Sequence, residues 1–160
     1  MPANLRIGHG YDIHRLQRGG TLVLASIVVA QNISPIAHSD GDVAIHALVD
    51  ALLGAAGLAD IGTYFPDTDP QYKNAPSRTF LEKTVQLLLE KGFRPINADI
   101  TILAEQPKLK PFNAQMTAAL TNILGAPVNL KAGTNEGLGD IGAGKAIAAH
   151  AIVLLEQADR

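Results

Sequence analysis

Cysteine and tryptophan are absent from this chain, and aromatic residues make up only 4% of it. Without cysteine, disulfides, thiolate metal ligands and a cysteine nucleophile are all excluded. A core built from the 47% hydrophobic residues must therefore be mainly aliphatic. The net charge is only −2, with no long run of one sign, which argues against nucleic acid or an anionic membrane as the main partner.

Long apolar segments are also lacking. The longest run, residues 146–155, is interrupted by His150 and is too short to span a bilayer. The start, Met1-Pro2-Ala3-Asn4, has no basic region followed by an apolar stretch, so no targeting segment is expected. We expect a cytoplasmic protein whose 160 residues, numbers 1–160, form a single domain.

Hydrophobic periodicity predicts the order of strands and helices. The pair Gly19-Gly20 indicates a turn. The segment 147–155 is apolar throughout and fits either a buried helix or a central strand, of which we favour the strand. The predicted strands are 5–8, 21–30, 96–103, 128–132 and 147–155, and the predicted helices are 42–53, 77–91 and 112–124. Ser39 or Asp40 is expected to cap the first helix, and Ser77 the second.

This order predicts an α/β (α+β) fold with one mixed β-sheet and helices packed on one face. No second layer of helices is available for the other face of the sheet. Because the last predicted strand is apolar on both sides, self-association is the expected way to cover that face.

A metal site is indicated by the spacing of Asp12 and His14. In an extended segment, residues two apart point to the same side, so the two side chains can converge. With His46 from the first helix they form a set of three ligands, typical of a catalytic zinc with an open fourth position. Asp42 and Asp50 each lie four residues from His46, and either can accept its second ring N–H. The alternatives are structural histidines and solvated helix charges.

Residues 59–70 contain several proline and aspartate residues and few apolar anchors. Such a segment can be a mobile loop over a functional site. The alternative is a rigid, turn-rich connection.

Several stretches together resemble the 2-C-methyl-D-erythritol 2,4-cyclodiphosphate synthase family. They are RIGHGYDIHRL, AHSDGDVAIHALVDALLGAAGLADIG, FPDTDP, SRTFLEK, NADITILAEQPKLKP and VNLKAGTNEGLG. The resemblance runs over residues 6–155 and is weakest at residues 25–35. It implies a homotrimeric lyase of the non-mevalonate isoprenoid pathway, with each active site between two subunits. The implied reaction converts 4-diphosphocytidyl-2-C-methyl-D-erythritol 2-phosphate to the 2,4-cyclodiphosphate and releases CMP.

The resemblance also implies residue roles. Asp12, His14 and His46 match zinc ligands, and Glu136 matches a ligand of a second divalent ion, Mg²⁺ or Mn²⁺. His38 and Thr134 match residues that stabilise the transition state. The implied substrate contacts are Ser39, Asp60, Ile61, Gly62, Phe65, Asp67, Asp69, Ala104, Pro107, Lys108, Leu109, Ala132, Gly133 and Asn135. Among these, Asp60 and Gly62 match the sugar site; Phe65, Asp67 and Asp69 match a lid; and Ala104, Pro107, Lys108 and Leu109 match the cytosine pocket.

Two other readings compete with the synthase. The same Asp/His/His set suits a zinc hydrolase, although no acidic general base adjoins the motif. The second alternative is a trimeric protein that binds isoprenoid diphosphates without catalysis. Against it, Ala143 lacks the charge of the arginine that many related sequences carry near this position. Thr134 and Glu136 taken alone also fit an ordinary polar turn.

Overall fold

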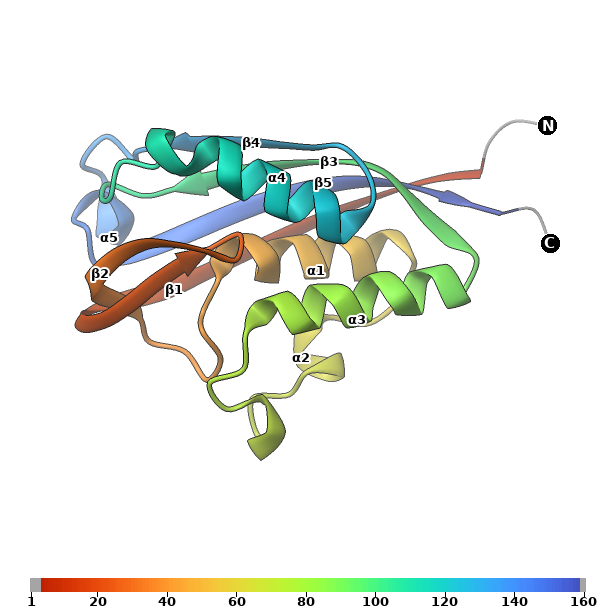
Figure 1. Ribbon diagram of the computed structural model, residues 1–160, viewed down its shortest axis with the longest axis horizontal. Coiled ribbons are helices and arrows are strands. Elements are labelled where there is room, and N and C mark those ends of the chain that lie inside the picture. Colours follow the sequence, from red (N-terminus) through yellow and green to blue (C-terminus); the bar gives the residue numbers. More distant parts are fainter. Residues whose placement is uncertain (1–3, 159–160) are drawn as a thin grey trace.

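The computed structural model describes residues 4–158. Residues 1–3, on which the expected lack of a targeting segment depends, lie outside the described residues. The fold is built on a five-stranded mixed sheet in the order β2-β1-β5-β3-β4 (Figure 1). The strands are β1 (Asn4–Leu24), β2 (Ile27–Pro35), β3 (Phe93–Leu103), β4 (Val128–Gly133) and β5 (Ala146–Gln157). β3 and β4 pair in parallel, and the other neighbours are antiparallel.

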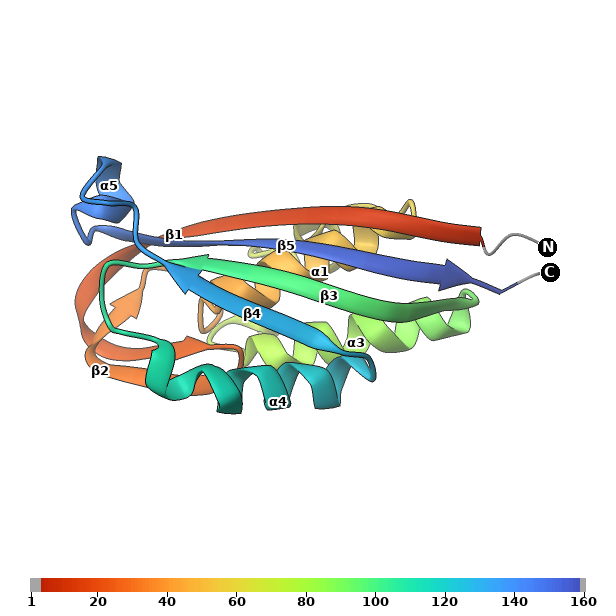
Figure 2. The same ribbon diagram turned by 90° about the horizontal axis from the view of Figure 1, so that it is seen from above.

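Three long helices lie on one side of the sheet (Figures 1 and 2). They are α1 (Val43–Ala55), α3 (Ser77–Glu90) and α4 (Asn113–Leu124). The shorter elements are α2 (Ile61–Tyr64), α5 (Gly139–Gly142) and the 3₁₀ turns η1 (Pro70–Tyr72) and η2 (Lys110–Phe112). The predicted mixed sheet with helices on one face is confirmed, as is the choice of a strand for residues 147–155. Within residues 4–158, no helix is long and apolar enough to cross a membrane.

The predicted strand at residues 21–30 is wrong, because the chain reverses in its middle. Ala25 and Ser26 form the turn, with φ of 50° and 66°, between β1 and β2. β1 pairs with β5 as far as Arg15 and with β2 from Leu16 onward. The resulting hairpin curls back towards α4 (Figure 2).

The predicted turn at Gly19-Gly20 is also wrong. Both residues remain in β1, where the pairing with β2 shifts register between Arg18 and Thr21. Their φ values of 87° and 75° are left-handed, which glycine adopts at little cost. The pair therefore forms an irregularity inside the strand, of the β-bulge kind.

Two glycines of β1 allow α1 to pack directly on the strand. A Cβ built on Gly8 would lie 2.0 Å from the carbonyl oxygen of Ala51, and one on Gly10 would lie 1.8 Å from that of Ala47. No other residue type fits at either position without moving the helix. This contact places the end of the Gly8–Gly10 segment, and the residues that follow it, beside α1.

The two faces of the sheet differ in burial. From Gly8 to Leu16, the even-numbered residues of β1 face the helices, where the core consists mainly of Leu, Ile, Val and Ala. The opposite face carries large apolar side chains that remain exposed to solvent: Leu5, Ile7, Tyr11, Ile13 and Ile152. β5 has the expected apolar residues on both sides, since Val153 is buried whereas Ile152 is 48% exposed.

Candidate metal centre

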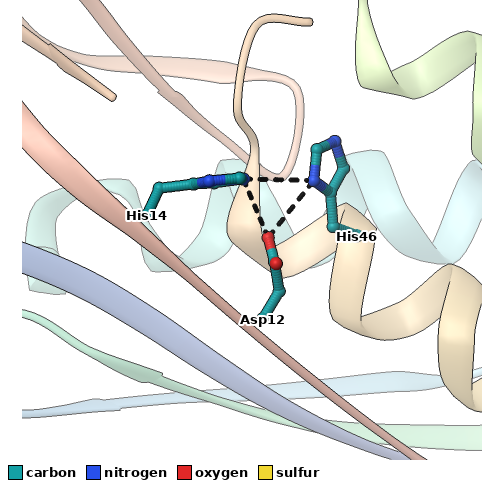
Figure 3. Close-up of side chains that lie close together, drawn as sticks. All are labelled: Asp12, His14 and His46. Atoms are coloured by element: carbon teal, nitrogen blue, oxygen red, sulfur yellow. Dashed lines mark hydrogen bonds and ion pairs between the residues drawn. The ribbon is translucent and has the colours of Figure 1, made fainter. Parts of the chain in front are cut away.

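Asp12, His14 and His46 converge on one point between β1 and α1 (Figure 3). Asp12 Oδ2 lies 2.9 Å from His14 Nε2 and 3.2 Å from His46 Nδ1, and the two nitrogens are 3.2 Å apart. Ligands of a tetrahedral ion with bonds of about 2.0–2.1 Å lie roughly 3.3 Å from one another. The three side chains thus form a candidate site for a divalent metal ion.

The carboxylate of Asp12 supports this assignment. Its Oδ2 is buried, yet it has no hydrogen bond of acceptable geometry within the described residues. Burial raises the pKa of Asp12, but the close contacts with His14 and His46 lower it more, so the net shift is well below the usual range. A buried, ionised oxygen without a hydrogen-bond partner fits a metal ligand. The donor set of two imidazoles and one carboxylate also suits zinc.

The other ring nitrogen of His46 contacts two hydroxyls. His46 Nε2 lies 2.8 Å from Ser77 Oγ and 3.2 Å from Ser39 Oγ. The prediction that Asp42 or Asp50 is its partner is therefore wrong. The carboxylate of Asp42 instead accepts from backbone N–H groups, as described below, and that of Asp50 accepts from the N–H of Ile61. Burial lowers the pKa of His46, but the nearby carboxylates, chiefly Asp12, raise it more, so the net pKa lies above the usual value for histidine.

Asp42 stabilises two elements at once. Its buried carboxylate accepts from the backbone N–H of Ala25 (3.0 Å), Ser26 (2.9 Å) and Ile45 (3.2 Å). It therefore caps α1 and holds the turn of the β1–β2 hairpin, so the predicted cap at Ser39 or Asp40 is wrong. Burial raises the pKa of Asp42 to about 6, against the opposing effect of its backbone hydrogen bonds.

Ser77 is the first residue of α3, and its side chain does not cap that helix as predicted. Its backbone N–H donates to Asp40 Oδ2 (3.0 Å), and its hydroxyl donates to Asp40 Oδ1. The hydroxyl of Ser77 contacts Asp40 and His46 and makes no hydrogen bond to a backbone N–H of its own helix. Periodicity gave no indication of this contact, because it joins residues far apart in the chain.

A pocket of about 380 Å³ contains all four residues predicted for the cytosine pocket, and three others predicted to act on the substrate. Seven predicted residues line it: Ala104, Pro107, Lys108, Leu109, Ala132, Gly133 and Thr134. They come from the segment after β3 and from the end of β4. The backbone N–H of Ala104 donates to the carbonyl of Gly133 (2.9 Å), which joins the two walls.

The turn after β4 carries Thr134, Asn135 and Glu136. The N–H of Asn135 donates to Glu105 Oε1 (2.8 Å), and the N–H of Glu136 donates to Thr134 Oγ1 (3.3 Å). Glu136 is exposed, with a left-handed φ of 52°. Glu105, which the sequence interpretation did not single out, thus helps to hold the turn. Glu136 is not part of the Asp12, His14 and His46 cluster.

The loop at residues 59–70 is more structured than expected. Asp60 caps α2 by accepting from Thr63 N (2.9 Å), and Ile61 N donates to Asp50 Oδ1 (2.8 Å). Phe65 stacks on Phe80 of α3 with ring centroids 4.8 Å apart, and Ile61 and Tyr64 also pack against the core, so the segment has more apolar anchors than the few expected. The proposed mobility of this segment stays a prediction.

The remaining predicted loop residues lie near one another. His38 Nε2 is 3.1 Å from the carbonyl oxygen of Asp69, which places His38 beside the loop. The carboxylate of Asp69 itself accepts from Gln71 N (3.0 Å). Gly62 and Asp67 are exposed.

Within one chain, the metal triad and the nucleotide pocket lie apart. Asp12 pairs with Ala149 of β5, Ala149 with Ile102 of β3, and Ile102 with Ala132 of β4. Three strand spacings of about 4.8 Å separate Asp12 from Ala132 by roughly 14 Å. Ala149 and Ile102 between them are fully buried, so core side chains separate the two sites.

The fold and the site define an α/β protein that has helices on one face of its sheet and a candidate divalent-metal triad between β1 and α1. The chain belongs to the YgbB family, whose sequence model matches residues 5–156. It is 53% identical over 157 residues to the 2-C-methyl-D-erythritol 2,4-cyclodiphosphate synthase of Thioalkalivibrio sulfidiphilus, covering 96% of this chain and 98% of that protein. The resemblance noted in the sequence is thereby confirmed.

Solved structures agree with this family. The bifunctional IspDF of Campylobacter jejuni has a TM-score of 0.94 and 40% identity, covering 98% of this chain and 43% of that one. The CDP complex of Plasmodium falciparum IspF has a TM-score of 0.84 and 33% identity, covering 99% of this chain and all of that one. The fold and the family are thus those of cyclodiphosphate synthases in isoprenoid biosynthesis.

Proposed function

We propose that the whole chain, residues 1–160, is one catalytic domain that cyclises 4-diphosphocytidyl-2-C-methyl-D-erythritol 2-phosphate. The 2-phosphate oxygen attacks the β-phosphorus, the bond from that phosphorus to the α-phosphate oxygen breaks, and CMP leaves. The observation that carries the proposal is the buried, unpartnered Asp12 oxygen between two imidazoles in a member of this family. A phosphate dianion needs no strong base, so catalysis depends on positioning and on neutralising negative charge.

Asp12, His14 and His46 would hold a zinc ion. When bound there, zinc supplies Lewis acidity towards a phosphate oxygen. Glu136 is exposed, and its carboxylate makes no hydrogen bond or ion pair within residues 4–158, which leaves it free to help hold Mg²⁺ or Mn²⁺.

Thr134 and His38 are proposed to stabilise the transition state. Thr134 Oγ1 accepts from the Glu136 backbone, so its own hydrogen is free to be donated to a phosphate oxygen. His38 Nε2 must donate to the Asp69 carbonyl, because a carbonyl oxygen only accepts. Its Nδ1 is then the atom left for the substrate, and the position of His38 depends on the loop.

The pocket beside β4 is proposed to bind the cytidine part of the substrate. CDP occupies the Plasmodium falciparum relative, and the residues lining this pocket include the four predicted for the cytosine pocket, Ala104, Pro107, Lys108 and Leu109. Asp60 and its neighbours in α2 would bind the sugar hydroxyls. The second oxygen of Asp60 remains available, because Thr63 N and Thr63 Oγ1 both bind Oδ1.

A homotrimer is proposed because one chain separates the two halves of the site. The exposed apolar face of β1 and β5 needs a cover, and a second copy can bring its nucleotide pocket to the triad of the first. Light scattering at micromolar concentration should give three times 16.8 kDa. A monomer mass would contradict the shared site.

The direct test incubates the chain with the cytidyl substrate and Mg²⁺, with and without a zinc chelator. We expect CMP and the cyclic diphosphate in equal amounts, and loss of both when zinc is removed. A hydrolase would instead release CMP with an open-chain phosphate. His46→Ala serves as the matched variant, since it removes one ligand from the triad.

A further inference from the structure

Nδ1 of His46 faces Asp12 and His14, and Nε2 faces the buried Ser77, which in turn contacts the half-buried Asp40. Ser77 Oγ lies 2.8 Å from His46 Nε2, and the side chain of Ser77 is fully buried. Both the hydroxyl and the backbone N–H of Ser77 donate to the carboxylate of Asp40. The three residues therefore form one chain of contacts that leads away from the candidate metal centre.

The direction of the hydrogen bonds in this chain is determined by their chemistry. The carboxylate of Asp40 only accepts, so the single hydroxyl hydrogen of Ser77 points to Asp40. Ser77 Oγ can then only accept from His46, which requires the hydrogen on Nε2. In a neutral imidazole the lone pair is then on Nδ1, the nitrogen that faces Asp12 and His14.

We infer that Ser77 and Asp40 are positioning residues that select the tautomer and ring orientation in which His46 binds the metal. This inference rests on the proposed metal-dependent function. Ser39 is a weaker candidate for the same task, because its oxygen is 3.2 Å from Nε2 and already accepts from Gly41 N. The pair also attaches the first turn of α3 to the segment before α1, so the start of α3 contributes to the geometry of the site.

The test measures zinc affinity by competition with a chromogenic chelator, together with the visible absorption spectrum of the cobalt-substituted protein. Ser77→Ala removes the acceptor, and its zinc affinity should fall about 10- to 100-fold, as is typical when the partner of a ligating histidine is lost. Its cobalt bands should also shift. Asp40→Asn, which retains one acceptor oxygen, should lose less affinity than Ser77→Ala.

Thr84→Val is the matched control. Thr84 is a buried hydroxyl residue of the same helix, but its hydroxyl donates to the carbonyl of Phe80, away from the triad. This variant should bind zinc within twofold of the wild-type affinity, even if its melting temperature falls. Ser77→Ala binding as tightly as wild type, with unchanged cobalt bands, would overturn the positioning role alone. A wild-type chain that binds no zinc would overturn both this inference and the proposed function.

Discussion

Gly10→Ala should disturb both the stability of the fold and the metal centre. The added Cβ would lie 1.8 Å from the Ala47 carbonyl oxygen. Cβ atoms in proteins essentially never come closer than 3.0 Å to such an atom, so the gap is about 1.2 Å too small. The obstructing atom belongs to the helix backbone and cannot rotate away. Overpacking of a core costs about 1–3 kcal/mol, and the rigid obstacle here favours the upper end. For a chain of this size, 3 kcal/mol lowers the melting temperature by about 6–12 °C.

The same displacement should weaken metal binding, because α1 carries His46 whereas β1 carries Asp12 and His14. A retreat of α1 by more than 1 Å separates ligands that now lie 3.2 Å or less apart. Calorimetry gives the melting temperature, and chelator competition gives the zinc affinity. A Gly10→Ala protein that melted within 2 °C of wild type and bound zinc normally would refute this reasoning.

Gly54→Ala is the control for this substitution. Gly54 lies in α1, and a Cβ there would have nothing within 4 Å. Alanine has the higher helix propensity, so this variant should gain about 0.5–1 kcal/mol of stability. Its zinc affinity should equal that of the wild type.

Three further outcomes are expected. Asp42→Asn should lose about 1–3 kcal/mol at pH 7, because an amide N–H₂ replaces an oxygen that accepts a backbone N–H. The pKa of Asp42 is raised from 3.8 to about 6, so the folded state binds more protons than the unfolded state in this window. Wild-type stability should therefore fall relative to Asp42→Asn as the pH rises from 4 to 6, measured by urea unfolding; an opposite slope would contradict the pKa shift. Asp50→Ala should speed hydrogen exchange at the amide of Ile61, which loses its acceptor, whereas exchange at the amides of β3 should stay unchanged. An exchange rate at Ile61 equal to that of the wild type would show that this hydrogen bond does not hold α2. His46→Ala should abolish zinc binding with the circular dichroism spectrum retained, and zinc binding at wild-type affinity would remove His46 from the ligand set.

Local patterns predicted much of the fold and the triad. The spacing of Asp12 and His14 is informative because a strand has a fixed period of two, and that period survives any change in tertiary packing. The apolar spacing in α1 placed His46 on a helix for the same reason. What periodicity could not supply was the approach of that helix to that strand, which depends on Gly8 and Gly10 facing the helix backbone.

Contacts between distant residues account for the errors. The pair Ala25-Ser26 contains no Gly, Pro, Asn or Asp to mark a turn, and the turn is stabilised by Asp42, which follows much later in the chain. Ser77 looked like a helix cap because the sequence does not show that Asp40 lies next to it. Gly19-Gly20 has the composition of a turn, but the same left-handed φ values also serve a strand irregularity.

The contact between Gly8, Gly10 and the backbone of α1 has a consequence for how this family can vary. Where helix and strand touch through side chains, a change of core residue alters their separation. Here backbone meets backbone, so the distance from β1 to α1 has a lower limit that no side chain determines. Leu48 and Leu52 can then be exchanged for other aliphatic residues while Asp12, His14 and His46 keep their spacing, which leaves the core free to diverge around an unchanged metal centre.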